Sequence, residues 1–263
     1  MANRYLMAVD AGTGSVRAVL FNEDGAQLSC VQREWTHAED PRYPGSMDFD
    51  WVHNWELASE CIRGAIAQAG VDAGDIAAVS TTCMREGIVL YDEAGQEIWA
   101  CANVDARSDD EVGQLIRMNP ELEKEIYRES GQTYALGALP RILWVKNKLP
   151  ELYARVKTVS MFNDWLIYKL TGVLKTEPSN GCTTGIFDLQ KRRWDASIMR
   201  KVGLKDDIFP PVAECGEVVS RVNAKGAADT GLREGTTVVA GGVTITFTGS
   251  CRMVPASASI SGG

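Results

Sequence analysis

The sequence has few of the residues that build metal centres or disulfide frameworks. Its 263 residues include only two histidines, His37 and His53, and its seven cysteines form no Cys-x-x-Cys pair. A structural zinc site needs four clustered nitrogen or sulfur ligands, so this composition argues against one. An odd number of widely scattered cysteines is typical of reduced thiols in a cytoplasmic protein rather than of a secreted disulfide framework.

Basic residues are also in deficit. Lys and Arg number 27 against 35 Asp and Glu, which gives a net charge of −8, whereas a nucleic-acid-binding surface needs clustered positive charge. No apolar run is long enough to span a bilayer, and Asp10 comes too early in the chain for the apolar core of a signal peptide. We therefore expect a cytoplasmic protein without nucleic-acid or membrane partners. A local basic pocket for a small phosphate remains compatible with this charge.

The spacing of the apolar residues predicts strands and helices in alternation. Strands are expected at 5–9, 16–21, 26–32, 76–82, 88–91, 97–99, 183–189 and 237–240. Helices are expected at 54–69, over most of 107–148 with breaks near Pro120 and at 131–140, at 163–170 and at 194–202, with an extended loop over 34–53. Three early strands followed by this alternation predict an α/β domain with a mixed sheet flanked by helices.

The first candidate site is the glycine-containing turn Asp10-Ala11-Gly12-Thr13-Gly14-Ser15, followed by Val16 and Arg17. Two glycines let backbone N–H groups converge on an anion, and the hydroxyls and Arg17 add donors. Asp10, at the end of a buried strand, is placed to hold a hydrated Mg²⁺. The alternative is a tight turn between two strands with no ligand.

A second candidate is Arg85-Glu86, where a buried strand ends. Glu86 can accept hydrogen bonds from the hydroxyls of a polyol while Arg85 donates to a hydroxyl or carbonyl oxygen. The alternative is a surface ion pair.

Alternating polar residues after Trp99 form a third candidate. In an extended segment Asn103, Asp105 and Arg107 would project to one face, beside a tryptophan that could stack on a ligand. The alternative is a solvated edge strand. A fourth pair, Asn163 and Asp164, is most simply interpreted as a helix N-cap.

Taken in order, these segments resemble the FGGY carbohydrate kinases. The resemblance rests on Asp-Ala-Gly-Thr-Gly-Ser-Val-Arg (10–17), Met-Arg-Glu-Gly (84–87), Ile-Trp (98–99) with Asn-Val-Asp-Ala-Arg (103–107), Asn-Asp-Trp-Leu-Ile-Tyr-Lys-Leu-Thr-Gly (163–172) and Pro-Ser-Asn (178–180) with Thr-Thr-Gly (183–185). It implies an actin-like, ribonuclease H-like fold with the N-terminal, substrate-binding domain at 1–242 and a divergent tail at 243–263. The family's C-terminal ATP-binding domain is not matched.

The resemblance also assigns roles to individual residues. The first phosphate loop of the family, which faces the γ-phosphate of ATP and Mg²⁺, matches Asp10, Gly12, Thr13, Ser15 and Arg17. Substrate contacts match Arg85 and Glu86, and a segment lining the same cleft matches Trp99, Asn103 and Asp105. The implied reaction transfers the γ-phosphate to a primary hydroxyl, chiefly by positioning and charge neutralisation.

Within the family, residues 84–91 and 98–107 look like those of members that act on the quorum-sensing molecule autoinducer-2, in its open-chain dihydroxypentanedione form. They are less like the segments of glycerol or xylulose kinases. The same likeness implies contact with the phosphocarrier HPr. Two alternatives stay open, namely a kinase of another small sugar or polyol and a non-catalytic module that binds the autoinducer or a sugar.

One departure from the family concerns its catalytic Asp. After the strand at 237–240 and Gly241-Gly242, Thr244 occupies that position, and a threonine hydroxyl does not serve as a general base near neutral pH. We therefore expect a truncated or frameshifted, catalytically impaired form, with a genuine divergent tail as the alternative.

Overall fold

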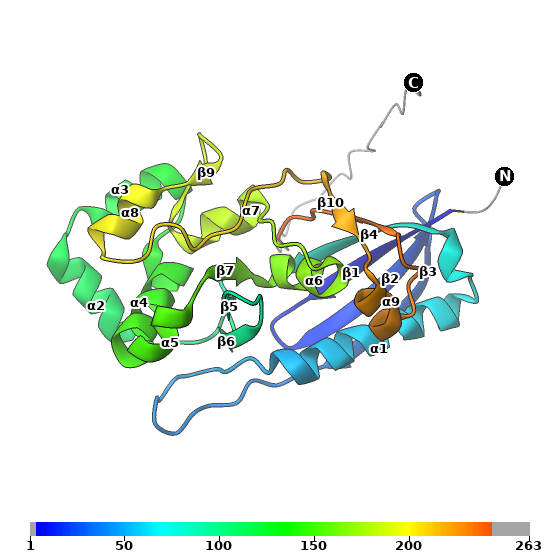
Figure 1. The fold of residues 1–263 in the computed structure, drawn as a ribbon, viewed down its shortest axis with the longest axis horizontal. Coiled ribbons are helices and arrows are strands. Elements are labelled where there is room, and N and C mark those ends of the chain that lie inside the picture. Colours follow the sequence, from blue (N-terminus) through cyan, green and yellow to red (C-terminus); the bar gives the residue numbers. More distant parts are fainter. Residues whose placement is uncertain (1–3, 244–263) are drawn as a thin grey trace.

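The computed structural model describes residues 4–243 (Figure 1). The strands are β1 (Tyr5–Ala11), β2 (Ser15–Asn22), β3 (Gln27–Glu34), β4 (Ile76–Cys83), β5 (Ile88–Tyr91), β6 (Glu97–Cys101), β7 (Thr158–Met161), β8 (Phe187–Asp188), β9 (Arg193–Trp194), β10 (Val218–Arg221) and β11 (Thr237–Val239). The α-helices are α1 (Trp51–Ala69), α2 (Asp109–Met118), α3 (Leu122–Ser130), α4 (Ala138–Lys148), α5 (Pro150–Arg155), α6 (Phe162–Thr171), α7 (Pro178–Gly181), α8 (Ala196–Lys201) and α9 (Ala224–Thr230). Short 3₁₀ turns lie at Ala73–Asp75, Tyr134–Leu136 and Cys182–Thr184.

The central sheet is mixed, as the sequence predicts. Its strand order is β10-β11-β4-β1-β2-β3, with β1 parallel to β4 and β4 parallel to β11, and antiparallel pairing elsewhere. The three parallel strands therefore end at the same edge of the sheet. Helices α1, α6 and α9 lie along this sheet, whereas α2 to α5 and α8 gather at the other end of the molecule (Figure 1).

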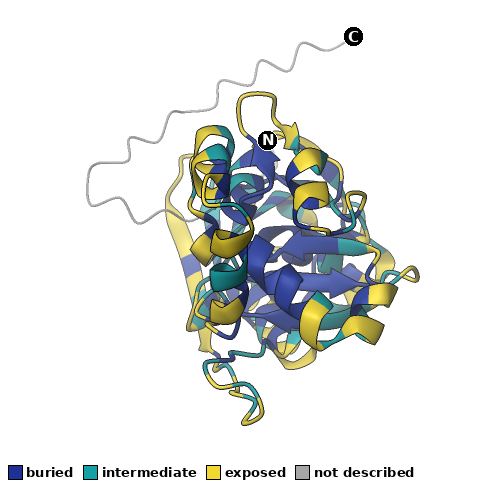
Figure 2. Cartoon of the chain, turned by 90° about the vertical axis from the view of Figure 1, so that its left-hand side faces the viewer, coloured by how far each residue is buried: buried dark blue, intermediate teal, exposed yellow. Residues whose placement is uncertain are grey.

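A second sheet, β6-β5-β7, separates two hydrophobic cores. Side chains alternate in direction along a strand, and in β5 the residues Val89 and Tyr91 face the core of the large sheet while Ile88 and Leu90 face the core among α2 to α5 and α8. A single strand thus contributes to both cores. Strands are buried between helices whose outer faces are exposed (Figure 2).

Helix α1 begins three residues earlier than its apolar spacing predicts. The Asp50 carboxylate caps it by accepting from the N–H groups of Val52 and His53, and the helix ends at Ala69 as predicted, with Gly70 in the left-handed conformation. Its buried face, which includes Ala58, Ile62 and Ala65, packs beneath β2 and β3. This packing fixes the back of the sheet.

One predicted strand is wrong, and the extended backbone that the one-face argument needed at 103–107 is not formed. Residues 183–189 do not form one strand, because the hydroxyls of Thr183 and Thr184 bond back to carbonyls three residues earlier and keep the chain in a helical turn, leaving only β8. Residues 103–107 turn instead of continuing β6. Among the helices of residues 4–243, none combines the length and apolar character that crossing a bilayer requires.

Candidate active site at the strand ends

The carboxyl ends of β1, β4 and β11 form the floor of the candidate site, which we call the strand-end site. Asp10 near the end of β1 lies opposite Arg17 of β2 and beside Thr82 of β4 in the strand register. The N–H of Met84 donates to the carbonyl of Ala11 over 2.7 Å. The segment that follows β4 is thereby tied to the end of β1, so two predicted site segments meet.

Asp10 and Arg17 are joined directly. The Nε and Nη2 atoms of Arg17 lie 2.9 and 2.7 Å from the same carboxylate oxygen of Asp10. Half of the Arg17 side chain is exposed. Its positive charge therefore contacts Asp10 and also faces solvent at the sheet edge. This arrangement presents a carboxylate and a guanidinium together, as a phosphate and a hydrated cation require.

The turn between β1 and β2 is held from behind by side chains of the following loop. Trp35 Nε1 donates to the carbonyls of Gly12 and Thr13, both at 3.1 Å, and His37 Nε2 lies 2.7 Å from the Thr13 carbonyl. The Gly12 N–H closes the turn onto the Ser15 carbonyl and is therefore already used. Thr13 and Gly14 are exposed at its tip.

The chain that leaves β11 is anchored to the same edge. Thr82 Oγ1 donates to the Gly242 carbonyl over 2.8 Å, Asn163 Nδ2 to the Gly241 carbonyl over 2.6 Å, and the Val243 N–H to Ser179 Oγ over 3.1 Å. Asn163 is therefore a brace for this loop rather than an N-cap; Asp164 accepts from the N–H of Met161, which precedes α6. Thr244 lies outside the described residues.

Arg85 and Glu86 extend beyond β4. Arg85 is exposed, and Glu86 is partly buried with a left-handed backbone, φ 74°, a conformation that costs energy for a residue with a Cβ. Burial raises the pKa of the Glu86 carboxyl, and the charges of Arg85 and Arg141 oppose that rise. In the described part of the chain, no carboxylate forms an ion pair with Arg85.

Of the three predicted residues after β5, Asn103 and Asp105 both accept from Arg141 through their main-chain carbonyls, and Asn103 also has a side-chain acceptor that is free within residues 4–243. The carbonyl of Glu86 accepts from the same guanidinium. The Oδ1 atom of Asn103 is buried and has no hydrogen-bond partner among the described residues. A buried acceptor without a partner costs free energy.

Asp105 and Trp99 are held by other protein groups instead, and we call this supporting layer, formed with Arg107 and Trp144, the wall. The fully buried carboxylate of Asp105 accepts from Arg107 Nε over 2.7 Å and from the Met47 N–H over 2.6 Å. Trp99 stacks on Trp144 at 6.1 Å, with the Arg107 guanidinium about equally close to both rings. The alternation that suggested one polar face does not hold, because the chain turns after Cys101.

Arg141 is the residue that sequence reasoning missed. It lies on α4 in an otherwise apolar stretch, Ala138 to Val145, and only 3% of it is exposed. A charged residue among buried apolar neighbours was the available signal, since burying a charge is costly unless polar partners surround it.

Sequence comparison decides the family. The sequence model for the N-terminal domain of the FGGY family of carbohydrate kinases matches residues 5–249. The chain belongs to the FGGY family. The match continues past Gly242, where the resemblance seen in the residues alone was expected to end.

Curated relatives that are about 49% identical to this chain are named autoinducer-2 kinase. Those of Salmonella paratyphi B and Yersinia enterocolitica are each 49% identical to this chain, over 92% and 90% of its length and 46% and 45% of theirs. The chain therefore spans about half the length of the curated relatives it matches.

Solved structures confirm the predicted fold of this FGGY domain. Xylulose kinase from Rhodospirillum rubrum superposes with a TM-score of 0.83 at 23% identity, covering 91% of this chain and 49% of that one. Gluconate kinase from Lactobacillus acidophilus gives 0.82 at 20% identity, with coverage of 92% and 48%. The domain has the α/β architecture of the actin-like sugar kinases.

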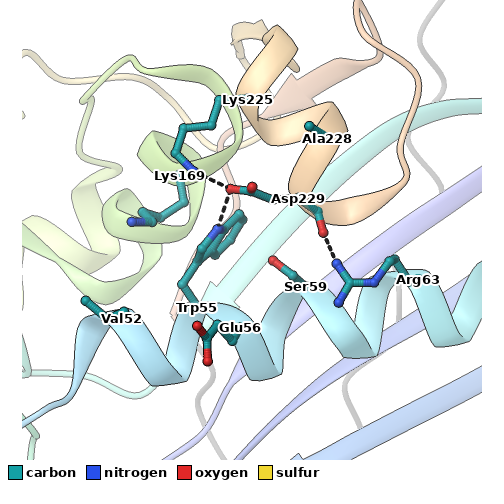
Figure 3. Close-up of a pocket in the computed structure, with 9 residues that line it drawn as sticks. All are labelled: Val52, Trp55, Glu56, Ser59, Arg63, Lys169, Lys225, Ala228 and Asp229. Carbon is teal, nitrogen blue, oxygen red and sulfur yellow. Dashed lines mark hydrogen bonds and ion pairs between the residues drawn. The ribbon is translucent and has the colours of Figure 1, made fainter.

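A pocket of about 450 Å³ lies away from the strand-end site, between α1, α6 and α9 (Figure 3). We call it the helical pocket; it is lined by Val52, Trp55, Glu56, Ser59, Arg63, Lys169, Lys225, Ala228 and Asp229. None of the predicted site residues of the FGGY domain lines it. Its charged groups bond mainly to the protein itself: Lys225 to Asp229 over 2.7 Å and Lys169 to Glu97 over 2.8 Å.

Proposed function

We propose that this chain forms the substrate-binding half of a carbohydrate kinase that acts on autoinducer-2. The observation that carries the proposal is the meeting of three segments, those of Asp10, Glu86 and Asn103, at one edge of the sheet. The name shared by relatives 49% identical supports the substrate. The wider setting proposed with it is cytoplasmic processing of a quorum-sensing signal, with HPr as a protein partner.

Each polar group at the site suits a part of a small open-chain polyol. The Glu86 carboxylate would accept from substrate hydroxyls, Arg85 would donate to a hydroxyl or carbonyl oxygen, and Asn103 Oδ1 would accept from a further hydroxyl. A site that hydrogen-bonds specific hydroxyls rejects analogues that lack them, because its own buried groups are then left unpaired. Asp105 and Trp99 would support this group from the wall.

The turn at residues 12–15 suits the γ-phosphate of ATP. Thr13 and Gly14 are exposed at its tip, and Asp10 and Arg17 lie beside it. The Asp10 carboxylate near the end of β1 would suit a Mg²⁺ that is held mostly by water and phosphate oxygens. When bound, Mg²⁺ would neutralise phosphate charge.

Transfer would take the γ-phosphate to a primary hydroxyl of the open-chain substrate. Positioning and electrostatic stabilisation account for most of such catalysis, with a base orienting the hydroxyl. Because Thr244 stands where the family has its catalytic Asp, we expect the 263-residue chain to bind substrate without turning it over.

Calorimetry with the open-chain dihydroxypentanedione tests the proposal. Glu86→Gln should weaken binding at least about tenfold, because a charge-assisted hydrogen bond is replaced by a neutral one. Glu93→Gln, a change at an exposed residue in the β5–β6 turn, serves as the matched control and should leave the affinity unchanged. No binding by the unmodified chain at millimolar ligand would overturn the proposal.

The alternatives separate in the same assay. Tighter binding of xylulose or glycerol than of dihydroxypentanedione would assign another sugar or polyol as substrate. Sustained ADP release from Mg·ATP and substrate, lost on Asp10→Ala, would show that the chain is a working kinase. Binding without turnover is the outcome we expect.

A further inference from the structure

The Arg141 guanidinium joins three separate segments through their main-chain carbonyls. Its Nη1 donates to the Glu86 carbonyl over 2.7 Å and to the Gly137 carbonyl over 3.4 Å. Its Nη2 donates to the carbonyls of Asn103 and Asp105 over 2.8 and 3.0 Å. The segment after β4, the turn after β6 and the start of α4 therefore share one buried cation.

This arrangement uses the planar fork of arginine. The two terminal nitrogens of the planar guanidinium point in different directions within one plane, so they reach carbonyls on different segments at the same time. A lysine ammonium is a single charged group on a flexible chain and lacks this fixed fork. Placing the charge among α4's buried residues carries a desolvation cost, which is offset only when the donors are well satisfied. The geometry thus favours one spacing between the segments of Glu86 and Asn103.

The Glu86–Gly87 backbone is also confined by an aromatic ring. A Cβ at Gly87 would lie 2.6 Å from Cε2 of Phe162, so only glycine fits against that ring. The Glu86 carbonyl is held by Arg141, and Glu86 itself adopts the left-handed conformation. A strained backbone persists only where its surroundings hold it in place. Here the Phe162 ring and the Arg141 guanidinium hold the Glu86–Gly87 backbone.

We propose that Arg141 is a positioning residue of the substrate site, which sets the distance between the Glu86 carboxylate and the Asn103 amide and so selects which pair of hydroxyls the site accepts. The inference rests on the proposed function of the site. Arg141 touches no substrate in this scheme; it acts through the two segments it joins.

Two variants separate the fork of Arg141 from its charge. Arg141→Lys keeps the charge and loses the fork; Arg141→Met loses both. The charges that act on the Glu86 carboxyl are those of Arg85, on its own segment, and Arg141, on α4. Because the ionised carboxylate is the acceptor, binding is lost as the pH falls through the pKa of Glu86, and removing an opposing positive charge moves that midpoint to higher pH.

We expect Arg141→Lys to weaken dihydroxypentanedione binding at least about tenfold with the midpoint of its pH profile unchanged, since strong hydrogen bonds are lost but charge is kept. Arg141→Met should weaken it further and raise the midpoint. Lys146→Met is the matched control: Lys146 lies on the same helix and also donates to a carbonyl, that of Gly203, and its loss should leave affinity and profile unchanged.

Amide hydrogen exchange on the unliganded chain tests the same role without a ligand. It also separates a local loosening of these segments from a general loss of stability. Arg141→Met should speed exchange at residues 86–88 and 103–107 beyond any global change, and Lys146→Met should not. If the unmodified chain binds and Arg141→Lys binds equally well, the positioning role is wrong while the proposed function stands. If the unmodified chain does not bind, the proposed function fails. If exchange at residues 86–88 and 103–107 is unchanged in Arg141→Met, Arg141 does not hold these two segments and the positioning role is wrong.

Discussion

The strand-end site and the helical pocket contain the same kinds of polar group and use them differently. In the helical pocket the carboxylate of Asp229 accepts from Trp55 Nε1 over 2.8 Å as well as from Lys225, and its carbonyl accepts from Arg63 (Figure 3). In the strand-end site Arg141 bonds to main-chain carbonyls, and Asn103 Oδ1 has no partner within residues 4–243. Most polar groups of the helical pocket are bonded within the protein and act as braces, although Ser59 Oγ there, like Asn103 Oδ1, is buried without a partner among the described residues.

The largest effect should come from Gly241, which lies two residues after the end of β11. A Cβ at Gly241 would lie 1.9 Å from the Thr81 carbonyl oxygen, a main-chain atom that cannot move aside. We expect Gly241→Ala to lower the free energy of unfolding by at least about 3 kcal/mol, measured by urea denaturation. Gly14→Ala is the control, because its Cβ would meet nothing within 4 Å and should cost less than about 0.5 kcal/mol. Equal losses would show that the sheet edge is not rigid.

A buried carboxyl beneath the strand-end site should make stability depend on pH. Burial raises the pKa of Asp164 from 3.8 to about 7, so between these values the folded chain holds a proton that the unfolded chain releases. The stabilisation is complete below about pH 4 and is lost as the pH rises to about 7, on the order of 2–4 kcal/mol. Asp164→Asn should lack this slope. Parallel unfolding free energies for the two chains across this range would contradict the prediction.

The smallest effect concerns the helical pocket. Here we expect a loss of stability without a loss of ligand affinity, whereas Glu86→Gln should lower ligand affinity. Asp229→Ala removes the acceptor of the Trp55 indole, of which only 6% is exposed, and should cost about 1–2 kcal/mol of unfolding free energy. Ligand affinity should not change. Asp229→Asn keeps an acceptor and should cost less. Weaker ligand binding in Asp229→Ala would break the distinction between brace and recognition site.

Local signals predicted most of the sheet and the joined parts of the site. The first three strands, β4, the β5–β6 hairpin and β11 follow from short apolar runs and turn residues, and family resemblance predicted the fold that the solved structures confirm. The meeting of the β1–β2 turn with Arg85-Glu86 follows from parallel strands ending together. These features depend on residues close in sequence, or on topology that a family preserves.

What sequence reasoning missed depends on distant partners. Arg141 lies 55 residues from Glu86 and 38 from Asn103, and nothing in the local pattern of α4 specifies those contacts. Asp105 carries the side chain expected of a ligand contact, yet Arg107 and the Met47 N–H satisfy it inside the wall. The turn at 103–107 misled the periodicity argument, because alternation has meaning only while the backbone stays extended.

The position of β4 has a consequence for the order in which the chain folds. Its two neighbours in the sheet are β1 and β11, the first and last strands within residues 4–243. During synthesis from the N-terminus, β4 can pair with β1 soon after it is made, but its other edge stays open until residues 237–239 emerge to pair with 78–80. The nascent chain thus carries an unpaired apolar strand edge from the completion of β4 until β11 emerges. A chaperone that covers strand edges would have its longest opportunity there.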